Sequence, residues 1–245
     1  MEPRDIVYLA QTENSIDRSG EAIKLMIQLA EVKPNFDQNE RQLLVLIYKT
    51  AIDPIRETIR TLSMYRDSSK ESGQSEQAQM IDDVCQSSIH DLDELCAQGL
   101  DLVDKVLLPA CQDPAGIAFY QKLRGDFYRY MVEFAKEDKI DEIKKNADSA
   151  YSAALQTATE KLPSSNPIRL GVILNYAVFK FEHAEETGAA REMLVSAIQN
   201  FSEDSNQLSE SSHKEAQNVI NVMQKNLVSW SPENPEEETV EEGEE

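Results

Sequence analysis

The chain has 245 residues, of which 40% are hydrophobic and 28% charged, a composition typical of a globular protein and unlike that of a disordered or membrane protein. Its 24 basic and 45 acidic residues give a formal net charge of −21, which argues against non-specific binding to nucleic acid or anionic lipid. Only 8 glycines and 9 prolines occur, fewer than sandwiches, barrels and Rossmann folds use in their turns, and we therefore predict an all-α fold.

Apolar residues recur every three or four positions along most of the chain, which predicts amphipathic helices. The first helix opens at Pro3, and Ser19-Gly20 separates it from a second helix that ends at Pro34.

A long third helix is predicted to begin at Asp37, because Asp37 and Glu40 have the spacing of a capping box. Within this helix Pro54 has no backbone N–H, which predicts a kink or a locally lost hydrogen bond. The polar, glycine-containing stretch 68–75 predicts the loop that follows.

Six further helices are predicted at residues 80–107, 117–134, 140–162, 168–183, 189–201 and about 209–230. Short links, one of them at Gly188, separate these segments, so the chain forms about nine antiparallel helices. No constant repeat period is evident, and a helical solenoid is kept only as an alternative. We predict one domain over residues 1–230 and a disordered acidic tail over 231–245, where the glutamate-rich sequence cannot bury enough apolar area to fold.

Neither export nor membrane attachment is indicated. The three cysteines are odd in number and lack the spacing of metal ligands, so we expect reduced thiols. The chain has no signal-peptide pattern at its N-terminus and no run of about 18 apolar residues. These features predict a cytoplasmic protein.

No motif points to an enzyme. Glu210 and His213 form a single E-x-x-H pair, whereas a di-iron bundle needs two such pairs and further glutamates. Phosphate loops, dinucleotide-binding glycine patterns and nucleophile elbows are absent from the sequence. We therefore expect no catalytic residue, no cofactor and no metal.

Two predicted helices carry basic stripes that are unusual in so acidic a chain. On the third helix, Lys49, Arg56 and Arg60 are spaced by seven and four residues and share one face. Farther along, Lys122 and Arg129 are seven residues apart, and Tyr130 follows directly. Each stripe includes one aspartate.

Two interpretations of these stripes remain open. They are either ordinary surface ion pairs between successive helix turns, or an anion pocket in which aspartates orient arginines that bind phosphate with two parallel hydrogen bonds.

At these residues the sequence resembles the 14-3-3 family of phosphoserine- and phosphothreonine-binding adaptors. The resemblance runs from about Asp5 to Trp230 and is carried by RQLLVLIYKT at 41–50, FYQKLRGDFYRYMVEF at 119–134, NPIRLGVILNYAVFKFE at 166–182 and NLVSW at 226–230. It implies a cup-shaped bundle of nine antiparallel helices, a dimer and one amphipathic groove per protomer.

The resemblance also implies the site. The residues that it assigns to phosphate binding are Lys49, Arg56, Arg129 and Tyr130. Those that it assigns to the rest of the peptide are Lys122, Leu174, Asn175, Val178, Glu182, Val222, Asn226 and Trp230. Of these, the two asparagines would hold the ligand backbone, and the leucine and valines would form an apolar wall.

Dimer contacts are implied between the first helices of one protomer and the helix containing residues 80–95 of the other. The residues assigned to them are Asp5, Ile16, Arg18, Glu21, Val84 and Asp91. Glu76 and Ser87 stand about where the family usually has lysines, so we expect a weakened homodimer that a heterodimer with a paralogue can outcompete.

Further departures concern the groove, because Asn218 and Ser229 stand where leucines are usual. We predict a non-enzymatic adaptor that binds phosphorylated motifs of client proteins in a basic pocket of a helical groove. The alternative is a 14-3-3-like scaffold whose groove has drifted toward unphosphorylated or acidic ligands.

Overall fold

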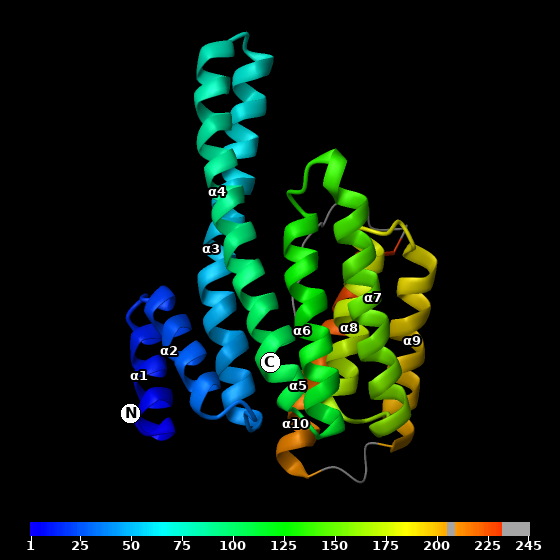
Figure 1. Cartoon of the computed structure of the whole chain (residues 1–245). Helices are drawn as coiled ribbons and strands as arrows, with labels where there is room; N and C mark the ends of the chain where they lie inside the picture. Colours follow the sequence, from blue (N-terminus) through cyan, green and yellow to red (C-terminus); the bar gives the residue numbers. More distant parts are fainter. Residues whose placement is uncertain (205–208, 232–245) are drawn as a thin grey trace. The chain divides into compact units, whose positions relative to one another are not determined.

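The computed structural model describes residues 1–204 and 209–231 (Figure 1). Its elements are α1 (Pro3–Ser15), α2 (Ser19–Val32), α3 (Gln38–Glu71), α4 (Ser75–Leu102), the π-helix η1 (Val103–Leu107), α5 (Leu108–Ala110), α6 (Pro114–Val132), α7 (Glu137–Lys161), α8 (Pro167–Glu182), α9 (Thr187–Asp204) and α10 (Glu210–Ser229). Because α4, η1 and α5 follow one another without a break, the described ranges contain nine helical segments and no strand. This confirms the predicted all-α fold. The predicted tail lies outside the described residues, apart from Ser231.

The helices gather into two compact units, Met1–Cys111 and Gln112–Glu245, and each is described by itself. In the N-terminal unit, α3 and α4 form a long antiparallel pair, and α1 and α2 pack together near the start of α3 (Figure 1). Arg66 and Asp82 bridge α3 and α4, with 3.2 Å between Nη1 and Oδ1. All three cysteines lie in this unit, are buried and form no disulfide bond.

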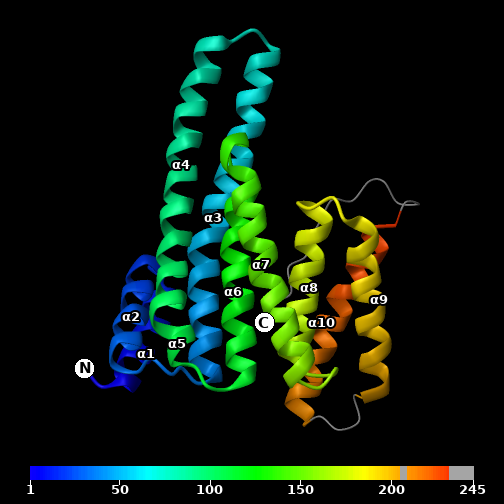
Figure 2. The same ribbon diagram turned by 45° about the vertical axis from the view of Figure 1, so that its right-hand side comes forward.

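In the C-terminal unit, α6 and α7 form an antiparallel pair, and α8 contacts α6, α7, α9 and α10 (Figure 2). One apolar core lies between α8, α9 and α10 and includes Leu174, Val178 and Met223. A smaller core joins α7 to α8 through Tyr151, Tyr176 and Phe179. Of the helices in the described ranges, none is both long enough and apolar enough to cross a membrane.

The predicted loop at 68–75 is too long, because α3 continues to Glu71. Gly73 ends the helix in the left-handed region, with φ of 73°. The N–H of Gln74 donates to the carbonyl of Ser69 at 2.9 Å, and that of Gly73 donates to Lys70 at 3.1 Å. This is the glycine-dependent Schellman ending of a helix, so the loop needs only three residues.

Two predicted separators are displaced by a few residues. Gly20 and Gly188 lie in the first turns of α2 and α9 rather than between helices. The chain instead reverses at Asp17 and Glu185, whose φ angles are 59° and 58°. Acidic residues in the left-handed region therefore make the turns that we assigned to glycines.

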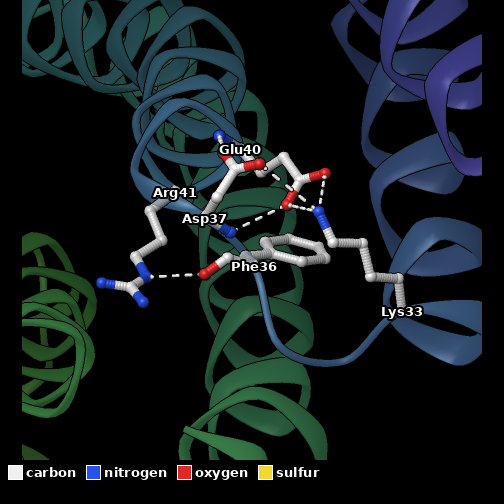
Figure 3. A network of polar contacts seen from close by, with 5 residues as sticks. All are labelled: Lys33, Phe36, Asp37, Glu40 and Arg41. Carbon is white, nitrogen blue, oxygen red and sulfur yellow. Dashed lines mark hydrogen bonds and ion pairs between the residues drawn. The ribbon is translucent and has the colours of Figure 1, made fainter. Parts of the chain in front are cut away.

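The start of α3 confirms the predicted capping box (Figure 3). The Glu40 N–H donates to Asp37 Oδ1 at 3.1 Å, and the Asp37 N–H donates to Glu40 Oε2 at 2.8 Å. Lys33 Nζ donates to both Glu40 oxygens at 2.6 Å, and the Arg41 Nε–H donates to the carbonyl of Phe36 at 3.1 Å. Burial alone would raise the pKa of Asp37, but the Glu40 N–H and the Lys33 ammonium outweigh it and lower this pKa.

We expect Asp37→Ala to lower the free energy of unfolding by about 1 kcal/mol, because it removes the acceptor for the Glu40 N–H. Asp37→Asn keeps an acceptor and should cost less. Since the folded-state pKa of Asp37 is lowered, its contribution should be constant from about pH 8 to about pH 5 and be lost only as the pH falls through that lowered value. Urea denaturation measures both variants, and equal losses would show that the cap is not responsible.

Candidate functional site

The four residues predicted to bind phosphate lie on two helices. Lys49 and Arg56 lie on α3 of the N-terminal unit, whereas Arg129 and Tyr130 lie on α6 of the C-terminal unit. Each pair is therefore described within its own unit. Within the described ranges, no cluster of three or more histidine, cysteine or acidic side chains suits a metal ion.

The pair on α3 includes Arg56, a buried guanidinium. Its Nη1 lies 3.3 Å from Oδ1 of Asp53, one turn earlier in α3. Arg60 is more exposed and has Nη1 3.8 Å from Oε2 of Glu57. Ion pairs along the helix surface are therefore present, as the first interpretation of the stripe predicted. The burial of Arg56 distinguishes it from an ordinary surface pair, because a carboxylate beside a buried guanidinium fixes its orientation.

Three charged side chains are buried on one face of α6 in the C-terminal unit. Lys122, Asp126 and Arg129 each expose 5% or less of their surface, and Lys122 Nζ lies 3.5 Å from Asp126 Oδ2. Removing charges from water is costly unless they are paired and hydrogen-bonded. The arrangement therefore depends on further polar groups from neighbouring helices.

Those groups come from α7 and α8 and meet at Asp126. The Tyr151 hydroxyl donates to Asp126 Oδ1 at 2.5 Å, and the Asn175 Nδ2–H donates to the same oxygen at 2.9 Å. The Tyr151 oxygen also accepts from the Arg129 Nε–H at 3.4 Å. The structure thus brings Lys122, Arg129 and Asn175 together around one carboxylate.

Arg129 has two further neighbours in the same unit. Its guanidinium carbon lies 4.9 Å from the centre of the Tyr130 ring, a cation–π contact. Its Nη1 lies 3.9 Å from Glu182 Oε2, and the same oxygen lies 3.4 Å from His183 Nε2. Three of the residues assigned to the site, Arg129, Tyr130 and Glu182, are therefore adjacent.

The remaining groove residues lie on α8 and α10 and at the end of α10. Leu174 and Val178 are buried in the core between α8, α9 and α10, and Val222 packs against that core. Trp230 stacks on Phe181, with 4.2 Å between ring centres and 8° between planes. Apolar and aromatic side chains of α8 and α10 thus pack together along the C-terminal half of α8.

Asn226 differs from its neighbours. It is only 2% exposed, yet its Nδ2 has no hydrogen-bond partner among the described residues. A buried amide donor without an acceptor is unfavourable by about 1–3 kcal/mol. A ligand group that accepts a hydrogen bond from this Nδ2 would relieve that cost and bind more tightly.

Sequence analysis did not identify Tyr151, although it joins Asp126 to Arg129. A signal was present in Gly125, because a glycine inside a strong helical pattern commonly has a packing reason. The structure shows that reason, since the Tyr151 ring lies against Gly125.

All the residues assigned to the dimer are exposed in the single chain. The two apolar members, Ile16 and Val84, expose 56% and 54% of their surface. Within the chain, Arg18 Nε lies 3.1 Å from Glu13 Oε2, and Glu21 Oε1 lies 2.8 Å from Lys24 Nζ.

A family model described as "14-3-3 protein" matches residues 9–231. The chain is 30% identical over 236 residues to 14-3-3-like protein GF14 iota of Arabidopsis thaliana, covering 96% of this chain and 88% of that protein. It is 30% identical over 227 residues to the checkpoint signal transducer rad24 of Schizosaccharomyces pombe, covering 93% and 84%. With 14-3-3 protein beta/alpha-A of Xenopus laevis it shares 28% identity over 238 residues, 97% of each chain.

Proposed function

Because the chain belongs to the 14-3-3 family and is therefore a non-enzymatic adaptor, we propose that it binds client proteins through phosphoserine and phosphothreonine. The observation that carries this proposal is Arg129, a guanidinium only 3% exposed. The Tyr151 hydroxyl, the Tyr130 ring and the Glu182 carboxylate surround it. A guanidinium held in one orientation is suited to binding a phosphate through two parallel hydrogen bonds.

The phosphate ligands in this proposal are Lys49, Arg56, Arg129 and Tyr130. A phosphoseryl group carries a charge of about −1.5 to −2 near pH 7 and three acceptor oxygens. Guanidinium and ammonium groups match that charge, and the tyrosine hydroxyl is a further donor. In a chain with net charge −21, such a cluster provides a local positive charge that attracts phosphate.

The peptide backbone is proposed to contact Asn175 and Asn226. The buried Nδ2 of Asn226 supports this assignment, because a ligand carbonyl would supply its acceptor. Residues proposed to contact the flanking side chains are Lys122, Leu174, Val178, Glu182, Val222 and Trp230. We also propose a single functional domain over residues 1–230, acting in the cytoplasm, and the match of one family model to residues 9–231 supports the former.

The proposed function is tested by titrating one fluorescent peptide with and without its phosphate. We expect the phosphorylated peptide to bind at least about tenfold more tightly, as one charge-assisted hydrogen bond already contributes about 1.5–3 kcal/mol. A third peptide, with glutamate at the phosphosite, represents an acidic ligand. Equal affinity for all three would overturn the proposal and favour the alternative of a drifted groove.

Two polar residues of α10, Asn218 and Ser229, lead to a prediction about the residues that flank the phosphosite of a ligand. Asn218, Val222 and Asn226 are spaced by four residues and share one face of the helix. Asn218→Leu with Ser229→Leu should tighten peptides that have apolar residues after the phosphosite. Each leucine that buries about 40 Å² contributes about 1 kcal/mol, or roughly fivefold. Peptides with polar flanks should change little, and an equal gain for both classes would show that these positions do not face the ligand.

We propose that the chain forms dimers, as a homodimer or with a paralogue, through the exposed Ile16 and Val84 and the charged residues beside them. Met80 on α4 and Tyr65 on α3 are also exposed in this unit. Asp5, Arg18, Glu21 and Asp91 would add ion pairs at its edge.

Glu76→Lys with Ser87→Lys is expected to tighten the homodimer. Each restored ion pair should contribute about 0–1 kcal/mol, and the effect should be larger at low salt because exposed pairs are screened. Sedimentation at about micromolar concentration measures the dissociation constant. Glu76→Gln with Ser87→Asn, which adds no positive charge, is the control. An association that neither salt nor the lysines alter would contradict the proposed contacts.

A further inference from the structure

Tyr151 and Gly125 are in unusually close contact. A Cβ atom at position 125 would lie 2.7 Å from Cδ1 and from Cε1 of Tyr151, and 2.8 Å from Cγ. The ring therefore lies against the backbone of α6 at a place where only glycine fits. Glycine inside a helix is less favourable than alanine by about 0.5–1 kcal/mol. The close approach of the ring explains why glycine occurs here despite this cost.

The approach brings the Tyr151 hydroxyl between an acid and a base of α6. It donates its single hydrogen to Asp126 Oδ1 at 2.5 Å, and its oxygen accepts from the Arg129 Nε–H at 3.4 Å. A phenolic hydroxyl can donate and accept at the same time. The two charged side chains are thus joined through one neutral group from α7.

The ring of Tyr151 also packs against two aromatic rings of α8. Tyr151 stacks on Tyr176, with 5.6 Å between ring centres and 19° between planes. Its ring centre lies 5.7 Å from that of Phe179. Burial, followed by the charge of Asp126, raises the pKa of Tyr151 well above its usual value of 10.0. The hydroxyl therefore keeps its hydrogen, and remains a donor to Asp126, throughout the physiological pH range.

We propose that Tyr151 is a positioning residue for phosphate binding, with Gly125 as the space that admits its ring. This inference rests on the proposed function, because it takes Arg129 as a phosphate ligand. Holding Nε fixes the plane of the guanidinium and hence the direction of its two terminal nitrogens. A side chain ordered before the ligand arrives loses less conformational freedom on binding.

Tyr151→Phe tests the inference, since it removes one oxygen and leaves the ring and its stacking partners. We expect the phosphopeptide to bind about threefold to tenfold more weakly, the change associated with one hydrogen bond, and the unphosphorylated peptide to be unaffected. Tyr176→Phe is the matched control. It removes a hydroxyl from the adjacent stacked ring, one that donates to Asp148 at 2.7 Å, and its affinity should stay within about twofold of wild type.

A second measurement does not depend on the variants. In the wild-type protein, the Arg129 Nε–H should exchange with solvent slowly in the absence of ligand, as seen by NMR of arginine side chains. Exchange as fast as that of an exposed arginine would overturn the inference. Equal weakening by Tyr151→Phe and Tyr176→Phe would also overturn it, by indicating a general loss of packing.

Arg129→Ala separates the inference from the function on which it rests. If this variant loses the preference for phosphate while Tyr151→Phe binds as wild type does, the positioning role is wrong and the proposed function stands. If Arg129→Ala retains the full preference, the proposed phosphate ligand is wrong, and the positioning role is overturned with it.

Discussion

Arg129→Ala is expected to weaken phosphopeptide binding about tenfold or more and to leave the unphosphorylated peptide nearly unaffected. The lost interactions are charge-assisted hydrogen bonds, each of which contributes about 1.5–3 kcal/mol. Arg56→Ala, on α3, should weaken phosphopeptide binding to a similar extent. Lys49→Glu should weaken binding further, because it places a carboxylate near a dianion. Fluorescence anisotropy at one fixed ionic strength compares the three variants.

Lys105→Ala controls for the change in net charge. Lys105 is exposed and pairs with Asp101 at 2.8 Å, and its removal should change affinity by less than about twofold. The double variant of Arg56 and Arg129 adds a stricter test. Two arginines that bind one phosphate should show a coupling energy of about 0.5–3 kcal/mol in a double-mutant cycle, whereas independent sites should be additive. Wild-type affinity in both single variants would eliminate this set of ligands.

Features that depend on nearby residues in the chain were predictable. The capping box of Asp37 and Glu40 needs only a spacing of three, and it is present as predicted. The helical segments follow from apolar spacing, and their number is confirmed for the described ranges. Turn positions were less accurate where Asp17 and Glu185 adopt left-handed backbone conformations, because this choice depends on how the flanking helices pack.

The candidate site was only partly predictable. The sequence indicated that Lys122 and Arg129 share a helix face with one aspartate, but burial of all three depends on α7 and α8. The groups that satisfy Asp126 come from Tyr151 and Asn175, which are 25 and 49 residues away in the chain. Local spacing carries no information about partners at such separations. The hydrogen-bond network around Asp126 could therefore not be predicted without the folded structure.

Gly125→Ala is expected to disrupt the C-terminal unit although it adds only one methyl group. Alanine favours a helix by about 1 kcal/mol over glycine, and at an open position this gain would stabilise the protein. Here the added methyl group would lie 2.7 Å from the Tyr151 ring, so the ring must shift. Overpacking of this kind costs about 1–3 kcal/mol, and weakening the buried contact with Asp126 adds to the loss.

The net result of Gly125→Ala should be a lower free energy of unfolding, by about 1–3 kcal/mol, and phosphopeptide affinity reduced about tenfold through the displaced Arg129. Gly188→Ala is the matched control, because a Cβ there meets no atom within 4 Å, and it should leave both quantities unchanged or raise stability slightly. Urea denaturation and peptide titration measure the two variants. If Tyr151→Leu, which removes the ring, also removes the penalty of Gly125→Ala, the clash is its cause. Gly125→Ala with wild-type stability and affinity would show that the ring can move without disturbing the site.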